Sequence, residues 1–115
     1  MPIPEERRYT NDKLNAIVVE LRRQFELLYG ERLVRMVLFG SQARGDAAPE
    51  SDIDVMVVPW GPVEPGEEVA RTGAVTAGLS LKHDVVISRV FISAEQFSKE
   101  QSPLLLNVRR EGLSV

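Results

Sequence analysis

Two aspartates separated by a single residue are the feature of this sequence with the clearest chemical meaning. Asp52 and Asp54 open the run DIDVMVV, which is apolar and β-rich enough for a buried strand. Because side chains alternate across a strand, both carboxylates point to one face and Ile53 points to the other. Carboxylates combined with phosphate oxygens are the ligands that Mg²⁺ favours. The pair predicts a site for one or two metal ions that assist in-line attack on a phosphoryl group.

A glycine–serine pair precedes the two aspartates. Gly40 and Ser41 are followed by ten residues and then by Asp52. A glycine lets the backbone approach a phosphate closely, and a serine hydroxyl with nearby N–H groups can bind phosphate oxygens. Arg44 comes four residues after Gly40 and is a candidate for a further phosphate contact. This stretch therefore predicts a triphosphate site next to the metal site.

Other motifs for binding a nucleotide or a metal do not fit the chain. Gly40 and Gly45 have the glycine spacing of a Walker A loop, but Asp46 and Ala47 stand where that loop needs lysine and a hydroxyl residue. No G-x-G pair exists, and without a cysteine there is no disulfide or thiolate metal site. The single histidine, His83, cannot form a histidine metal site alone.

The elements that hold these residues alternate between helices and strands. Apolar spacing predicts a helix from Thr10 or Asn11 to Tyr29, strands at Leu33–Phe39 and Asp52–Val58, and a helix at about Glu67–Leu81. A third strand is expected at Asp84–Ile87, either ending there or continuing or pairing again at Val90–Ile92, and short helices follow Ser93 and Ser102. The stretch between the first two strands is expected to be a loop with one helical turn. This order predicts an α/β (α+β) domain whose mixed sheet carries the carboxylates on one face and helices on the opposite face.

The bulk composition indicates one ordinary globular domain that spans residues 1–115. Hydrophobic residues make up 43% and charged residues 27% of the chain, and the net charge is −3. That balance gives no reason to expect direct nucleic-acid binding. The N-terminus has no apolar signal region, and no apolar run is long enough to cross a membrane. We therefore expect a protein of the cytoplasm.

At the residues just described the chain resembles a known family. The pattern GSQARG followed by SDIDVMV is similar to the minimal nucleotidyltransferase (MNT) domains of the DNA polymerase β-like superfamily, and SPLLLNVRREG is similar to the end of such domains. The resemblance implies the polymerase β-like fold, with triphosphate bound at Gly40 and Ser41 and Mg²⁺ at Asp52 and Asp54. It also implies a third catalytic carboxylate on a following strand, for which Asp84 is the candidate.

The resemblance further implies a partner, because small MNT domains often act as antitoxins in HEPN/MNT toxin–antitoxin pairs. In such a pair the chain transfers AMP from ATP to a side-chain hydroxyl of the HEPN-domain toxin. One alternative is an antitoxin that neutralises its partner by occlusion, without catalysis. Another is modification of a small molecule such as an aminoglycoside, for which a dimer of this chain would have to supply the missing acceptor surface.

Simpler interpretations of single residues also stay open. Arg44 can form an ion pair with Asp46 or Glu50 instead of contacting phosphate. Asp84 can be an ordinary residue at the start of a strand, and His83 an ordinary loop residue.

Overall fold

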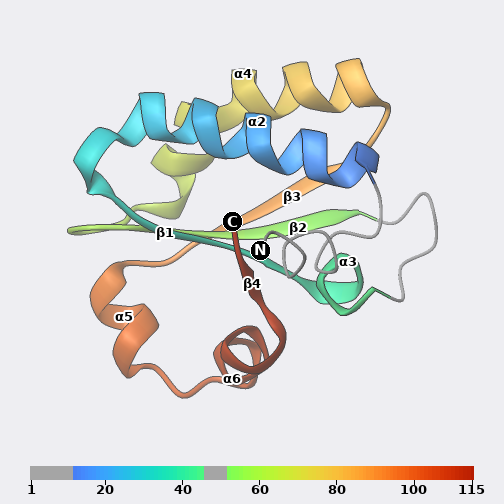
Figure 1. Cartoon of the computed structure of the whole chain (residues 1–115). Coiled ribbons are helices and arrows are strands. Elements are labelled where there is room, and N and C mark those ends of the chain that lie inside the picture. The colour runs from blue at the N-terminus through green and yellow to red at the C-terminus, as the bar shows by residue number, and fades with distance from the viewer. Residues whose placement is uncertain (1–11, 46–51) are drawn as a thin grey trace.

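The computed structural model of this chain describes residues 12–45 and 52–115 (Figure 1). The elements run in the order α2 (Asp12–Tyr29), η1 (Gly30–Arg32), β1 (Leu33–Phe39), α3 (Gly40–Arg44), β2 (Ile53–Pro59), α4 (Pro65–His83), β3 (Ile87–Phe91), α5 (Ala94–Lys99), α6 (Pro103–Glu111) and β4 (Leu113–Ser114). Nearly every expected element is present. The cap expected at Thr10 or Asn11 lies outside the described residues.

The four strands form one mixed sheet in the order β3-β2-β1-β4. β1 runs antiparallel to both β2 and β4, whereas β2 and β3 are parallel. A parallel pair needs a long crossover, and α4 supplies it between β2 and β3. β4 is a two-residue strand that the sequence pattern did not indicate. The α/β class and the mixed sheet are thus confirmed.

The main core lies between the sheet and the two long helices, α2 and α4 (Figure 1). Every third or fourth residue of α2 is apolar, and this stripe faces the sheet. Its most deeply buried members are Ile17, Leu21 and Phe25, which are at most 1% exposed. Burial of this stripe fixes which side of β2 faces inward: Ile53, Val55 and Val57 belong to the same core.

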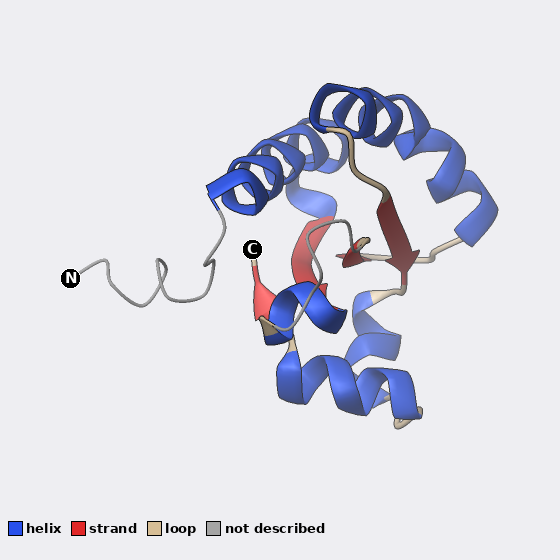
Figure 2. Ribbon diagram, turned by 90° about the vertical axis from the view of Figure 1, so that its right-hand side faces the viewer, coloured by secondary structure: helices blue, strands red, loops and turns tan. Residues whose placement is uncertain are grey.

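The opposite face of the sheet is partly covered as well, which differs from the expectation that all helices pack on one face. A second cluster contains Val37, Met56 and Val58 from the strands and Leu105 and Val108 from α6. α5 and α6 lie on this side, away from α2 and α4 (Figures 1 and 2). The physical reason is that β2 is apolar on both faces beyond Asp54, so both faces need a cover.

The third strand begins later than expected. We expected Asp84–Ile87 to be a strand, but α4 continues to His83 and β3 starts at Ile87. Asp84 ends the helix in the left-handed conformation with φ 54°, and its N–H donates to the Ser80 carbonyl. Aspartate tolerates this conformation better than most residues, which lets it serve as a C-terminal cap.

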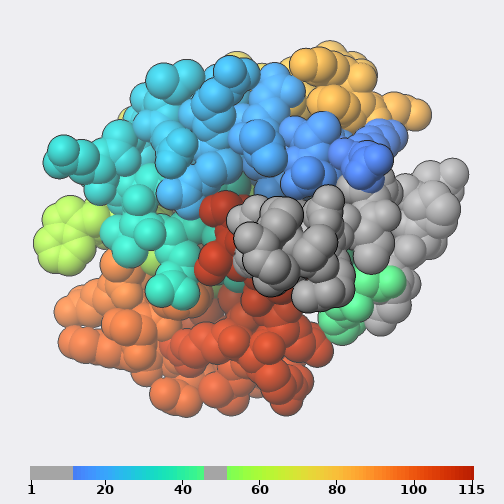
Figure 3. Space-filling view, in the orientation of Figure 1, coloured from blue at the N-terminus to red at the C-terminus, as the bar shows by residue number. Residues whose placement is uncertain are grey.

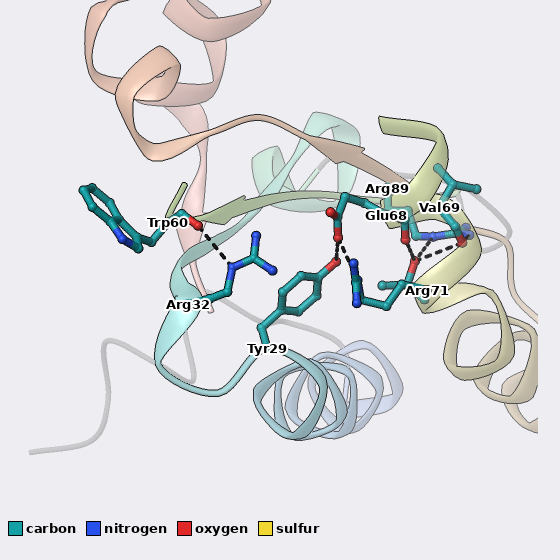
Figure 4. A network of polar contacts seen from close by, with 8 residues as sticks. Tyr29, Arg32, Trp60, Glu68, Val69, Arg71 and Arg89 are labelled. Atoms are coloured by element: carbon teal, nitrogen blue, oxygen red, sulfur yellow. Dashed lines mark hydrogen bonds and ion pairs between the residues drawn. The ribbon is translucent and has the colours of Figure 1, made fainter. Parts of the chain in front are cut away.

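A buried polar network ties α2 to α4 (Figure 4). Tyr29 Oη donates a 2.6 Å hydrogen bond to Glu68 Oε1, and Arg71 Nε donates to the same oxygen at 3.1 Å. Arg89 links α4 to β3, since its Nε lies 2.6 Å from Thr72 Oγ1.

In the described part of the chain, no helix is both long and apolar enough to cross a membrane.

Candidate active site

The two aspartates lie at the start of β2, on the face of the sheet opposite the long helices. Asp52 immediately precedes the strand and Asp54 is its second residue. Ile53 belongs to the core under α2, whereas Met56 belongs to the cluster under α6. Alternation along the strand therefore turns Asp52 and Asp54 toward the α6 side. α5 and α6 cover the later part of this face at Met56 and Val58, and Asp52 stays exposed.

The electrostatic state of Asp54 shows that the two carboxylates influence each other. Partial burial raises the pKa of Asp54 above its ordinary value, and the nearby charge of Asp52 raises this pKa further. Both effects disfavour the ionised form, because the negative charge has less access to water and has a like charge beside it. A bound divalent cation would relieve both penalties. The pair thus has the donor chemistry and the charge that fit Mg²⁺.

Gly40 brings the glycine–serine pair directly to Asp54. β1 and β2 are antiparallel with Phe39 opposite Asp54, so the residue after Phe39 begins α3 beside this carboxylate. Gly40 has φ +75°, and a Cβ atom there would lie 2.6 Å from Asp54 Oδ2. The left-handed conformation favours glycine, and a larger residue would displace the Asp54 carboxylate. The ten intervening residues therefore return the chain to the point where it left the sheet.

Replacing Gly40 by alanine is expected to damage the site more than the fold. The new Cβ meets the Asp54 carboxylate and the backbone must keep a left-handed φ, which costs about 1–2 kcal/mol for a residue with a Cβ. We expect nucleotide affinity to fall about 10-fold as Asp54 is displaced. Titration with ATP and Mg²⁺ measures this loss. Gly73→Ala, in open space within α4, is the control and should bind like the wild type.

Ser41 and Arg44 both lie on the short helix α3. Ser41 is half-buried, and its carbonyl accepts a 3.0 Å hydrogen bond from the N–H of Gly45 that closes this turn. Arg44 Nη1 lies 3.6 Å from Glu111 Oε1 at the end of α6. The acidic residues that we considered as alternative partners of Arg44, Asp46 and Glu50, lie outside the described residues.

Asp84 is not brought together with the aspartate pair. In residues 12–45 and 52–115, no three acidic, histidine or cysteine side chains are grouped closely enough to hold a metal ion. Asp84 caps α4, three residues before β3 begins. Its role as a third catalytic carboxylate stays a prediction. His83 lies against α2, where its Nε2 is 3.8 Å from Glu20 Oε1.

The structure adds two residues that the sequence did not point to. Ser88 lies opposite Asp54 in the parallel β2–β3 pairing, so its side chain shares the face of the carboxylates. Glu111 contacts Arg44 from α6. No local motif marks either residue, because both reach the site through pairings that join distant parts of the chain.

Comparisons with known proteins place the chain in a family. A profile of the nucleotidyltransferase domain family matches residues 18–105, which include β1, α3 and β2 with all the residues just described except Glu111. The chain belongs to the nucleotidyltransferase domain family. Two curated relatives from Methanocaldococcus jannaschii are named protein adenylyltransferases. One is 32% identical over 74 residues, which are 64% of this chain and 74% of that protein. The other is 39% identical over 72 residues, which are 63% of this chain and 66% of that protein.

Solved structures share the fold of this nucleotidyltransferase domain. A toxin–antitoxin crystallised with AMP-PNP superposes with a TM-score of 0.59 at 19% identity, over 86% of this chain and 69% of that one. A nucleotidyltransferase from Sulfolobus solfataricus gives a TM-score of 0.57 at 15% identity, over 90% and 86%. At these identities the likeness concerns the fold alone.

Proposed function

We propose that this nucleotidyltransferase transfers AMP from ATP to a side-chain hydroxyl of a partner protein, with Mg²⁺ bound at Asp52 and Asp54. The observation that carries the proposal is the close approach of Gly40 to Asp54, where a Cβ would come within 2.6 Å of the carboxylate. A triphosphate held along Gly40 and Ser41 is then within reach of a cation on the aspartate pair. Nucleotide transfer requires the phosphate-binding residues and the metal-binding residues to be adjacent. A purely structural role for Gly40 and Ser41, or for Asp52 and Asp54, would not require this.

The reaction is a displacement at the α-phosphorus of ATP. The acceptor oxygen forms a bond to this phosphorus while the bond to the bridging oxygen breaks, and pyrophosphate leaves with that electron pair. Mg²⁺ would neutralise charge on the phosphates when bound. Gly40, Ser41 and Arg44 hold and orient the triphosphate. Asp84 is the proposed acceptor of the hydroxyl proton, a role that requires the α4–β3 connection to bring it closer to Asp54 than it lies here.

A protein is the acceptor we favour, and two features support this choice. The relatives from M. jannaschii carry the name protein adenylyltransferase. Among the described residues, the helix beside the aspartate pair, α3, has only five residues and offers little surface to enclose a small acceptor. We propose a HEPN-domain toxin as the partner, in keeping with the toxin–antitoxin neighbour and the MNT resemblance.

The mass of the partner protein after the reaction tests this proposal. The purified chain is mixed with ATP, Mg²⁺ and the candidate toxin, and the toxin is then examined by intact-mass spectrometry. We expect the toxin to gain the mass of one or more AMP groups and to lose its activity. Omission of Mg²⁺ should abolish the gain, and so should a non-hydrolysable ATP analogue blocked at the α–β bridge.

Neutralisation by occlusion is the second candidate. It predicts a tight complex and loss of toxin activity with no change in the mass of the toxin. The pairing of Asp52 with Asp54 on one face of β2 argues against it, because a domain that only binds its partner has no need to keep two like charges together. Transfer to a small molecule instead predicts an AMP adduct of an aminoglycoside in the same assay without any toxin.

A further inference from the structure

An ion pair joins the candidate phosphate-binding helix to the last helix of the domain. Arg44 Nη1 on α3 lies 3.6 Å from Glu111 Oε1 on α6, and the two side chains are 43% and 31% exposed. The two helices contact each other, and they lie side by side in the space-filling view, α3 in green and α6 in red (Figure 3). Arg44 follows Gly40 by one helical turn, so its side chain starts on the same side of α3 and leans toward Gly40.

The position of Glu111 is unfavourable for α6 itself. A carboxylate in the last turn of a helix lies near the negative end of the helix dipole, where a cation is preferred. The same turn contains Arg109 and Arg110, as the dipole favours, yet it ends on Glu111. A nearby guanidinium offsets this cost. The ion pair with Arg44 thus gives this carboxylate a favourable interaction outside its own helix.

The chain around Glu111 is held in place on both sides. Gly112 N donates a 2.8 Å hydrogen bond to the Val108 carbonyl, and a Cβ on Gly112 would lie 2.4 Å from Val37 Cγ1. Leu113 then pairs with Leu38, two residues before Gly40. The antiparallel pairing of β4 with β1 thus delivers Glu111 to the end of β1 at which α3 begins. A carboxylate on such a fixed backbone can orient a flexible arginine.

We propose that Glu111 is a positioning residue, which holds the Arg44 guanidinium in the orientation that binds the triphosphate of ATP. The proposal rests on the proposed function, since it assigns a role to Arg44 within that nucleotide site. Glu111 itself carries a negative charge and does not contact phosphate. Its effect is to order the arginine before ATP arrives, so that less conformational freedom is lost on binding. The expected signature is weaker ATP binding with little change in the chemical step.

A double-mutant cycle tests this role. ATP affinity and the KM for ATP are measured with Mg²⁺ for the wild type, Glu111→Gln, Arg44→Ala and the double variant, together with kcat and the melting temperature. We expect Glu111→Gln to raise Kd and KM for ATP about 3- to 10-fold and to change kcat less than 2-fold. In the Arg44→Ala background the same substitution should have no further effect, because Glu111 then has no arginine to orient.

The control is Glu95→Gln, which removes a carboxylate that pairs with Lys99 on the exposed surface of α5. It should match the wild type in every measurement. The proposal is overturned if Glu111→Gln binds ATP as well as or better than the wild type, or if it weakens binding equally with and without Arg44. If the wild type itself binds no ATP, the proposed function fails and not merely the role of Glu111.

Discussion

Replacement of Asp54 by asparagine is expected to lower the rate of AMP transfer at least about 100-fold, a loss typical of removing a group that stabilises charge in the transition state. Asparagine keeps the shape of the side chain but removes the negative charge that a metal ion needs. Since the change is isosteric, the backbone of Gly40, which lies against this side chain, does not have to move. The rate is measured with saturating ATP and partner protein, by the mass gain of the partner over time.

Although Asp54→Asn should lower the transfer rate, it should not lower the stability of the fold in the absence of metal. The pKa of Asp54 is raised in the folded state by burial and by Asp52, so the folded chain holds this proton more tightly than the unfolded chain. Stability is then lost as the pH rises from the ordinary carboxyl pKa through the raised value, and at neutral pH the ionised group costs free energy. Asparagine has no such cost, and the variant should melt at the same temperature as the wild type or higher.

Added Mg²⁺ should change the thermal stability of the wild type and of Asp54→Asn differently. The wild type should gain thermal stability as Mg²⁺ is added, since a ligand that binds only the folded state stabilises it. Asp54→Asn should gain little. Glu64→Gln, an exposed change before α4, is the control and should retain both the transfer rate and the response to Mg²⁺. Retention of full transfer by Asp54→Asn would remove the aspartate pair from the mechanism.

The parts of the site that were predicted from sequence depend on local rules. The shared face of Asp52 and Asp54 follows from alternation along a strand, and the strand itself follows from its apolar run. The return of the chain from Gly40 to Asp54 follows less directly, because it needs the antiparallel register of β1 and β2. The fold class and the family were correct for the same reason: the informative residues are close together in the chain.

The parts that the sequence did not reveal depend on contacts between distant segments. Nothing local determines whether Asp84 starts a strand or ends a helix, since the apolar residues after it are compatible with both assignments. Here α4 continues to His83 and Asp84 becomes its cap. Glu111 lies 67 positions after Arg44 and reaches it only through the pairing of β4 with β1. Glu68 likewise has the sequence context of an exposed helical glutamate, yet it is 3% exposed.

Replacement of Glu68 by alanine is therefore expected to cause a large loss of stability. The change leaves the hydroxyl of Tyr29 without its 2.6 Å acceptor and Arg71 without its carboxylate, inside a space that alanine does not fill. Breaking a fully buried ion pair costs about 3–5 kcal/mol, but Arg71 is 42% exposed and water screens part of the interaction. We expect the free energy of unfolding to fall by about 2–3 kcal/mol, measured by urea denaturation.

Glu67→Ala is the matched control, because the same substitution is made one residue earlier on the exposed side of α4. It should change stability by less than about 0.5 kcal/mol. Equal losses in the two variants would mean that helix propensity, and not the network, determines the effect.

The pH dependence identifies the source of the loss at Glu68. Burial by itself would raise the pKa of Glu68, but the hydrogen bonds from Tyr29 and Arg71 outweigh it, and the net pKa lies below the ordinary value of 4.5. A carboxyl with a lowered pKa in the folded state stabilises the fold above its ordinary pKa, and this stabilisation is lost as the pH falls through the lowered value. The difference between the wild type and Glu68→Ala should therefore be largest near neutral pH and shrink below about pH 4. A difference that stays constant with pH would assign the loss to the cavity alone, whereas a shrinking difference assigns it to the charged network that fastens α4 to α2 behind the sheet.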